Sequence, residues 1–281
     1  MTTVTSAGAL AGLVGDSEAF LADTWAVRAA TYRSTDPCAP LGATDVWEAF
    51  DCGLLVGPYF SVTRNAVSAP ATDITVTRKV QQKPRARYAN ADGVRTWFAA
   101  GYTVGLHQPD HWHAGLKQLA DALREELRAD VRSAVFLAPP TGDTEGGSAQ
   151  QTAGHVFVRQ LEGESRWSVG GEGRRTRIAL TPGSVLYIPP GDEHAVSVDD
   201  GDALYLTLVV RRPSARDVAE EALVRFLRSA AAQEIAGRHH YLSLEDKVDW
   251  LRRELTAHLA GQDIDELVAA AVGAYRRAGQ A

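Results

Sequence analysis

The stretch from Pro182 to His194, which reads PGSVLYIPPGDEH, constrains the fold more than any other part of the sequence. Its β-branched and aromatic residues favour a short strand over residues 184–188, and the proline and glycine residues at 189–191 favour a tight turn. The strand that returns from this turn places the imidazole of His194 inside a small barrel. A turn followed by a partly exposed histidine is the alternative interpretation.

A metal site in such a barrel needs more than one imidazole, so further ligands are expected on a strand that comes roughly forty residues earlier. They should be spaced as His-x-Asp, His-x-Glu or His-x-His, because residues i and i+2 face the same side of a strand. The candidate strand covers residues 154–161, GHVFVRQL, and is followed by a turn at 162–163 and a second strand at 165–169.

These segments resemble the JmjC-like bacterial cupins, the iron- and 2-oxoglutarate-dependent hydroxylases that include the ribosomal-protein arginine hydroxylases. The resemblance runs through residues 101–108, 134–140, 156–160 and 183–194 in the order of the family. It covers roughly the middle half of the chain. It implies a mainly β protein built on a double-stranded β-helix, the cupin or jelly-roll fold, with a C-terminal helical bundle.

The resemblance also implies that the iron ligands are replaced. The family strand carries His-x-Asp, and the alignment places Gln150 on the histidine and Thr152 on the aspartate. His155 lies at an odd offset from both, so a regular strand points it to the opposite face, whereas a β-bulge would turn it inward. We therefore expect no metal, and His194 with His155 as the ligands if a metal is bound.

The positions that contact 2-oxoglutarate in the family are changed as well. Ser165 stands where the family carries a lysine or arginine two residues before Trp167, and the loss of that cation removes a contact worth about 1.5–3 kcal/mol. Two further positions, an asparagine and a tyrosine in the family, are Ala134 and Phe136 here. We predict a pocket lined by Gln150, Thr152, Ser165, Trp167, Ala134, Phe136 and Gln160.

The favoured interpretation is a degenerate JmjC-like cupin that has no iron or 2-oxoglutarate site and uses no cofactor. It would bind a small-molecule or peptide ligand, either as a binding protein or as a metal-free cyclase, isomerase or dehydratase, with a role in secondary metabolism. His194 and Tyr187 would supply hydrogen bonds or proton transfer in the cavity.

The alternative is an active Fe(II)- and 2-oxoglutarate-dependent hydroxylase with non-standard ligation, acting on a peptide, a protein or a natural product. Its ligands would be His194, His155 and a carboxylate from the glycine-rich segment at 141–148, such as Asp143 or Glu145.

Three histidines and an aspartate within residues 107–113, HQPDHWH, have a composition typical of zinc sites. Pro109 and Asp110 also have the character of a helix start, and residues 114–127 carry apolar residues at helical spacing. We interpret the cluster as helix-entry residues. A zinc-dependent cupin isomerase or lyase is the alternative that would use it.

The 281 residues, 45% of them hydrophobic, suffice for one large domain with helical additions. We predict a mixed α/β region at 1–100 that packs on the barrel, the barrel itself at 101–212, and a helical region at 213–281 that forms a homodimer. No apolar run approaches the length of a membrane span, and the N-terminus lacks the order of a signal peptide. Because Cys38 and Cys52 are too few and too loosely spaced for a disulfide framework, we expect a cytoplasmic protein.

The net charge of −6 disfavours nonspecific binding to nucleic acid. A local basic run at Arg78-Lys79 and Lys83 to Arg87 is interpreted as a solvated face, with a phosphate or an acidic partner as the alternative ligand.

Overall fold

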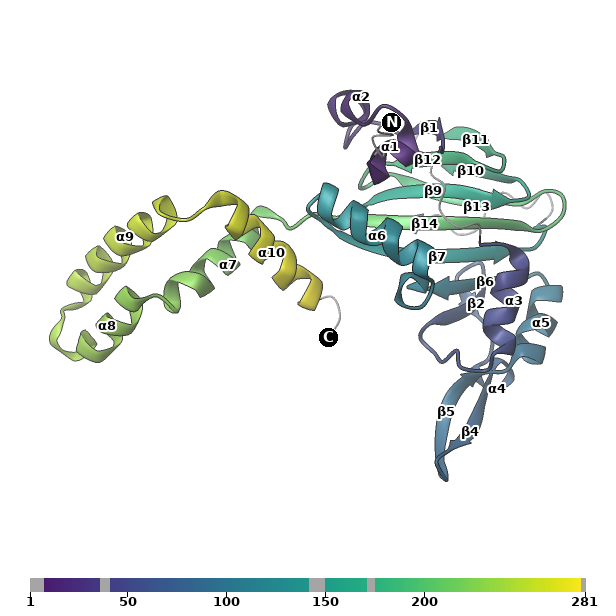
Figure 1. Ribbon diagram of the computed structural model, residues 1–281, viewed down its shortest axis with the longest axis horizontal. Coiled ribbons are helices and arrows are strands. Elements are labelled where there is room, and N and C mark those ends of the chain that lie inside the picture. The colour runs from purple at the N-terminus through teal and green to yellow at the C-terminus, as the bar shows by residue number, and fades with distance from the viewer. Residues whose placement is uncertain (1–7, 36–40, 142–149, 171–174, 279–281) are drawn as a thin grey trace, which may run out of the picture. The chain divides into compact units, whose positions relative to one another are not determined.

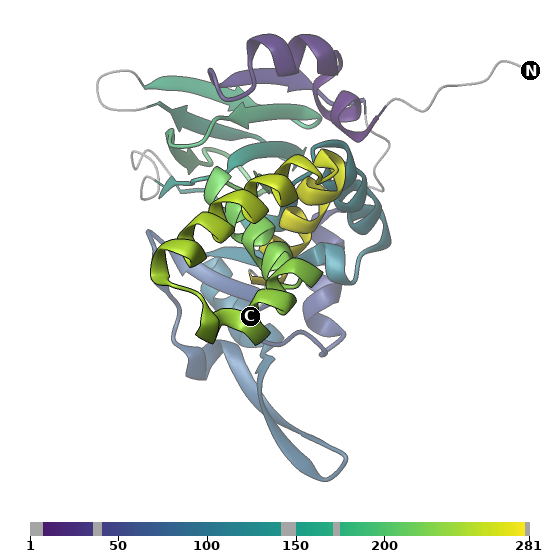
Figure 2. The ribbon, with the colours of Figure 1, turned by 90° about the vertical axis from the view of Figure 1, so that its left-hand side faces the viewer.

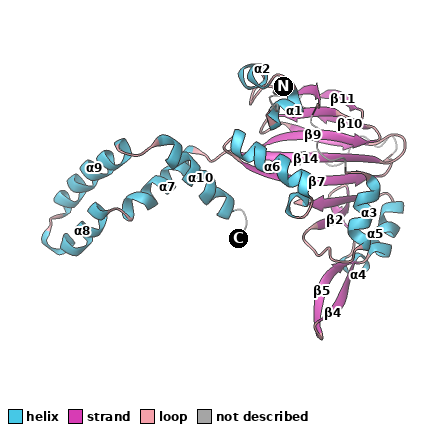
Figure 3. Cartoon of the chain, viewed as in Figure 1, coloured by secondary structure: helices cyan, strands magenta, loops and turns pink. Residues whose placement is uncertain are grey.

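The computed structural model describes residues 8–35, 41–141, 150–170 and 175–278, and it divides into two compact units (Figure 1). The first unit comprises residues 1–126 and 131–211, and the second comprises residues 127–130 and 212–281. Helices alone make up the second unit beyond residue 212, whereas strands dominate the first (Figure 3). None of the helices among the described residues has both the length and the apolarity of a membrane span.

Two antiparallel sheets form the body of the first unit. The larger has the strand order β1-β12-β9-β14-β7-β6-β2-β3, and the smaller has the order β11-β10-β13-β8. The larger sheet contains β1 (Ala30–Arg33), β2 (Phe60–Arg64), β3 (Val67–Ser68), β6 (Thr103–His107), β7 (Asp130–Ala138), β9 (His155–Glu162), β12 (Ser184–Ile188) and β14 (Ala203–Arg211). The smaller contains β8 (Gln150–Gln151), β10 (Ser165–Val169), β11 (Thr176–Leu180) and β13 (Glu193–Ser197).

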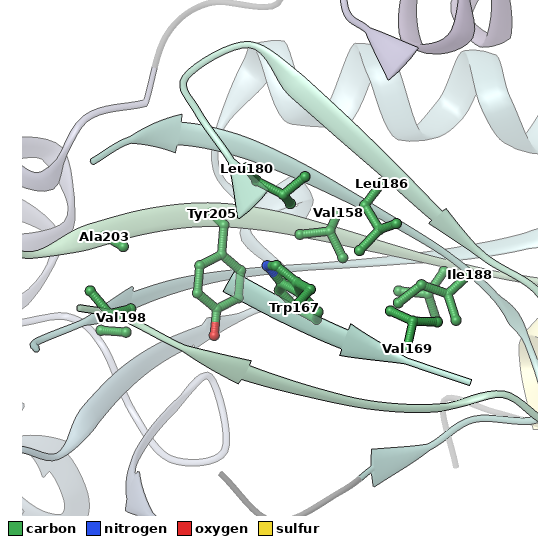
Figure 4. Packing of buried hydrophobic residues seen from close by; sticks show 11 residues of the cluster. Val158, Trp167, Val169, Leu180, Leu186, Ile188, Val198, Ala203 and Tyr205 are labelled. Carbon is green, nitrogen blue, oxygen red and sulfur yellow. The ribbon is translucent and has the colours of Figure 1, made fainter. Parts of the chain in front are cut away.

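The core of the unit lies between these two sheets (Figure 4). Strand alternation sends every second residue inward, so Val156 and Val158 of β9 meet Trp167 and Val169 of β10. Each fully buried side chain of this size contributes about 1.5–3 kcal/mol to folding. This pair of packed sheets is a double-stranded β-helix and confirms the predicted fold class.

Glycines set the tight turns between these strands. Gly163, between β9 and β10, has a φ of 62°, and a Cβ at this position would lie 2.1 Å from the carbonyl oxygen of Asp202. Gly191, in the turn before β13, has a φ of 88°. Both conformations favour glycine, and the second directs the strand that carries His194 back towards the barrel.

Short helices and one hairpin complete the first unit. The helices are α1 (Ala9–Val14), α2 (Ser17–Asp23), α3 (Ala43–Asp51), α4 (Ala71–Ile74), α5 (Ala91–Ala99), the 3-10 turn η1 (Pro109–His111) and α6 (Ala114–Glu126). The hairpin consists of β4 (Thr75–Val80) and β5 (Lys83–Ala89). Because β1, β2 and β3 pair within the larger sheet, the first hundred residues contribute strands to the barrel as well as packing on it.

The second unit contains α7 (Ala215–Leu227), α8 (Ala230–Arg238), the 3-10 turn η2 (His239–Tyr241), α9 (Leu244–Ala260) and α10 (Ile264–Ala278). Ser214 caps α7 in a capping box with Asp217, and the Ser243 hydroxyl accepts a hydrogen bond from the backbone N–H of Asp246 at the start of α9. The ring of Phe226 packs within 5.9 Å of the Trp250 ring, which joins α7 to α9.

The histidines at 107–113 each have a different partner. His107 bonds the Ser61 hydroxyl at 2.9 Å, His111 bonds the Tyr59 hydroxyl at 3.2 Å, and His113 accepts the N–H of Leu116 at the start of α6. Asp110 is buried in an ion pair with Arg124 at 2.7 Å and accepts a hydrogen bond from Ser133. The cluster therefore fixes the entry to α6, as we interpreted it, and does not converge on a zinc ion.

Replacing Arg124 with methionine should lower the free energy of unfolding by about 3–5 kcal/mol, because the buried carboxylate of Asp110 would lose its cation. Chemical denaturation followed by circular dichroism measures this loss. The matched control is Lys117→Met on the same helix, which breaks only an exposed pair with Asp121 and should cost less than about 1 kcal/mol. Equal losses in the two variants would contradict the prediction.

Candidate functional site

A cavity of about 290 Å³ opens in the first unit, with walls that come from both sheets. Six residues that the sequence analysis assigned to the site line it: Ala134, Phe136, Gln150, Thr152, Trp167 and His194. The predicted site residues are therefore brought together in large part, although they are up to 60 positions apart in the chain.

Strand pairing explains how His194 meets Gln150. β13 lies between β8 and β10, so that His194 is directly opposite Gln150 on one side and opposite Val169 on the other. Thr152, just beyond β8, lines the same cavity. The two positions that align with the family's His-x-Asp ligands are thus next to the histidine of the returning strand.

His194 is buried, with 7% of its surface exposed. Burial lowers its pKa below 6.5, and this effect outweighs the Asp192 carbonyl, which raises the pKa. That carbonyl lies 3.4 Å from Nδ1 and can only accept a hydrogen bond, so Nδ1 carries the proton and Nε2 keeps a lone pair. The imidazole is therefore neutral near pH 7, in the form that binds a metal ion or accepts a proton.

Aromatic rings form the apolar wall of the cavity. Tyr205 of β14 lies 5.5 Å from the ring of Phe136 and 5.4 Å from that of Trp167, and burial raises the pKa of its hydroxyl well above the usual range. Thr207 and Val209 follow on the same face of β14. The sequence analysis missed all three. Their spacing at i, i+2 and i+4 within a predicted strand is the signal that would have identified them.

A single cation lines the cavity among the described residues. This cation is Arg64, which lies at the end of β2, next to the edge strand β3 of the larger sheet. Its guanidinium donates a hydrogen bond to the carbonyl oxygen of Ala100 at 3.2 Å. No aspartate or glutamate belongs to the described lining. Arg64 was not predicted, because nothing in the local sequence relates β2 to the motif around His194.

Ser165 and Gln160 were predicted to line the pocket, but the structure places them behind it. The Ser165 hydroxyl donates to the side-chain oxygen of Gln160 at 2.6 Å and accepts from the indole N–H of Trp167 at 3.0 Å. Both residues are buried and face one another. Their role in this structure is to hold Trp167 in the cavity wall.

Tyr187 and His155 were predicted as partners of His194, and the structure separates them from it. Tyr187 alternates with Leu186 and Ile188, which face the core, so its ring lies on the other side of the larger sheet. Its hydroxyl bonds Nδ1 of His155 at 2.8 Å, and the His155 ring stacks on Trp25 at 3.6 Å. His155 therefore points to the face opposite the cavity, as expected for a regular strand, and no β-bulge turns it inward.

The described residues do not form a complete metal site. Three His, Cys, Asp or Glu side chains close enough to share an ion do not occur in the part of the chain that the structure describes. His194 is the one such side chain in the described lining of the cavity. Asp143 and Glu145 lie outside the described residues.

Tyr187→Phe should lower the free energy of unfolding by about 1–3 kcal/mol, because the change removes a buried hydrogen bond to His155 and one to the Ala26 N–H. The cavity should not respond, so the imidazole proton signals of His194 in an NMR spectrum should keep their positions. Trp167→Phe is the positive control, since its ring lies 6.1 Å from that of His194. A shift of the His194 signals in Tyr187→Phe would show that the two sides of the sheet communicate.

Comparisons with known proteins agree with this geometry. No protein-family model matches the chain. It is 28% identical over 152 residues to the bifunctional lysine-specific demethylase and histidyl-hydroxylase NO66 of Branchiostoma floridae, and 25% identical over 213 residues to NO66 of Drosophila yakuba. These matches cover 53% and 61% of this chain, but the chain spans only 24% and 31% of those proteins.

Solved structures give the same family of folds. The ribosomal oxygenase YcfD from Escherichia coli, in complex with cobalt and succinic acid, superposes with a TM-score of 0.56 at 18% identity, over 90% of this chain and 69% of that one. The complex of YcfD with cobalt and 2-oxoglutarate has a TM-score of 0.55 and covers 89% and 68%.

The expectation that the chain uses no cofactor is contradicted by these comparisons, because the structures that share its fold hold a metal together with 2-oxoglutarate or succinate. The expected fold family, in contrast, is confirmed by both the sequence and the structural relatives. By fold the chain is a double-stranded β-helix of the JmjC and cupin type, and part of its sequence is similar to the NO66 proteins.

Proposed function

We propose that this protein is an Fe(II)- and 2-oxoglutarate-dependent oxygenase with non-standard ligation, acting on a peptide, a protein or a natural product. The observation that carries the proposal is the placement of His194, buried and neutral, in a cavity between two cupin sheets. The named activities of the NO66 relatives and the cobalt complexes of YcfD support it.

The described residues alone do not fit the metal. A 2-His-1-carboxylate site needs three protein ligands, and the described lining offers His194 with the neutral oxygens of Gln150 and Thr152. The proposal therefore requires a ligand from outside the described residues, for which Asp143 and Glu145 are the candidates. Because this ligand set is incomplete, we assign no reaction step to the metal.

The chain's own residues suit an anionic ligand of moderate size. Arg64 supplies a cation in a wall that is otherwise neutral, and it is the described group best able to pair with a carboxylate of 2-oxoglutarate. The rings of Phe136, Trp167 and Tyr205 give the cavity an apolar surface. Such an arrangement combines one charge-assisted contact with an apolar surface, as small-molecule sites commonly do.

Anaerobic titration of metal-free protein with Fe(II) and 2-oxoglutarate should give a saturable charge-transfer absorption band and binding heat. His194→Ala should abolish the band, since it removes the one imidazole in the described wall. Arg64→Gln should weaken 2-oxoglutarate binding about tenfold or more, because a charge-assisted hydrogen bond contributes about 1.5–3 kcal/mol.

Arg166→Gln is the matched control, because Arg166 is an exposed arginine that pairs with Asp199 away from the cavity lining. It should bind like the unmodified protein. Absence of both the band and the heat in the unmodified protein would contradict the proposed function.

A second copy of the chain is the partner that the helical unit favours. Leu244, Val248, Leu251 and Leu255 of α9 follow one another at spacings of four, three and four residues, which is the pattern of a coiled-coil seam. The first three are 73%, 49% and 42% exposed, and none of the 17 residues of α9 is buried within the chain. We propose that α9 pairs with its counterpart in a homodimer, because water contact with such a seam is unfavourable.

In solution at micromolar concentration, light scattering should therefore give about twice the chain mass of 30.2 kDa. Leu251→Lys should shift the mass towards that of the monomer, because it buries a charge in the seam. Leu54→Lys, at a leucine that is 76% exposed in the first unit, should leave the dimer intact. A monomeric mass for the unmodified protein would rule out the dimer.

A further inference from the structure

The hairpin of β4 and β5 extends away from the rest of the first unit (Figures 1 and 2). Its strands pair from Thr75 and Ala89 at the base to Val80 and Lys83 at the tip. Gln81 and Gln82 form the two-residue turn with φ of 49° and 63°, as a type I′ turn requires. Its base is fixed by a hydrogen bond of 2.8 Å from the Ala89 N–H to the Leu55 carbonyl, so the hairpin is an anchored arm.

This arm is strongly basic in an acidic chain. Residues 75–89 contain five cations and no acidic residue, whereas the chain has a net charge of −6. All five side chains are exposed, and none of them forms an ion pair with a carboxylate of the described residues. They are Arg78, Lys79, Lys83, Arg85 and Arg87.

Stability explains only part of this charge. Arg78 pairs with Arg85 in the strand register, but its guanidinium lies over the Tyr88 ring, so Arg78 has a stabilising contact. Lysine at an exposed edge discourages strand pairing between molecules, but that purpose does not call for five cations without an acidic residue among them. The distal half of the arm also buries no apolar side chain, since Val80 at its tip is 43% exposed. An anionic partner accounts for the arrangement, because it would neutralise the concentrated positive charge of the arm.

The character of the arm distinguishes between anionic partners. A protein interface requires an apolar core depleted of charge, and the distal half of the arm has no such anchor. A single-stranded nucleic acid requires exposed aromatic rings for base stacking. Tyr88 is the aromatic residue of the arm, and it lies near the base with the Arg78 guanidinium 5.6 Å above its ring. Of these three kinds of partner, the phosphates of a duplex fit the exposed cations of the arm best.

The shape of the arm selects the kind of duplex. The major groove of B-form DNA is about 12 Å wide and admits a two-stranded β-ribbon, whereas the major groove of A-form RNA is too narrow and deep for side chains to read. We propose that the β4–β5 arm binds the phosphate backbone of double-stranded DNA, without sequence preference, by entering the major groove. This proposal is independent of the chemistry in the cavity.

The acidic body of the protein does not prevent such binding. β4 has six residues, and at about 3.3 Å per residue it is roughly 20 Å long. Lys79 of β4 and Lys83 and Arg85 of β5 lie in the distal half of the arm, farther from its base than the Debye length of about 8 Å at physiological ionic strength. The negative potential of the body is therefore largely screened where these three cations are placed.

Fluorescence anisotropy with a labelled DNA duplex of about 20 base pairs, in about 50 mM salt, tests the proposal. The unmodified protein should bind, and its affinity should fall as salt is added. Combining Lys79→Gln, Lys83→Gln and Arg85→Gln should weaken binding at least tenfold and reduce the slope of log affinity against log salt by about 2.7, because each phosphate contact contributes about 0.9.

The matched control combines Arg216→Gln, Arg252→Gln and Arg253→Gln, which removes the same charge from exposed arginines of the helical unit. It should retain the affinity and the slope, and circular dichroism should show both variants folded. Equal weakening in the two variants would overturn the proposal, because net charge alone would then set the affinity. No binding of the duplex, or tighter binding of duplex RNA or of a polyglutamate peptide, would also overturn it.

Discussion

The apolar layer between the two sheets is the constraint on which the rest of the structure depends. Inward residues of β9, β12 and β14 meet those of β10 and β11, and they leave little space between them. At β8 and β13 the inward positions change from apolar residues to Gln150 and His194, and the layer opens into the cavity. The same alternation along the strands thus determines both the core and the site, so a register shift of one residue would turn both sets of side chains to the opposite face of the sheet.

Alternation also explains how much the sequence alone could predict. The turn residues before His194 fixed the direction of its strand, and the register of residues 150–160 then placed Gln150 and Thr152 beside it. Tyr187 could have been excluded by the same rule, because its neighbours Leu186 and Ile188 are core residues. Its assignment to the site followed the chemistry of the phenol and neglected the direction of the side chain.

Other features depend on contacts that no local pattern encodes. Ser165 and Trp167 are two residues apart on β10, so both side chains point to the same face of the strand. Only the hydrogen bond from the Trp167 indole to the Ser165 hydroxyl reveals that the indole ring covers Ser165. Arg64 reaches the cavity through β2, β6 and β7, more than 100 residues before His194 in the chain. Long-range pairing of this kind is set by the sheet order, which a single sequence does not specify.

The net charge of the chain is a poor guide to the ligand of the cavity, because the residues that line the cavity differ in charge from the chain as a whole. The described cavity wall holds a neutral His194, a protonated Tyr205 and the cation Arg64, without a compensating carboxylate. A cationic ligand would therefore lose hydration in the cavity without gaining a counterion, whereas an anion would gain one. The charge of the described wall thus has the opposite sign to that of the chain as a whole. The local wall therefore favours the acidic ligand proposed above, even though the net charge of −6 would suggest repulsion.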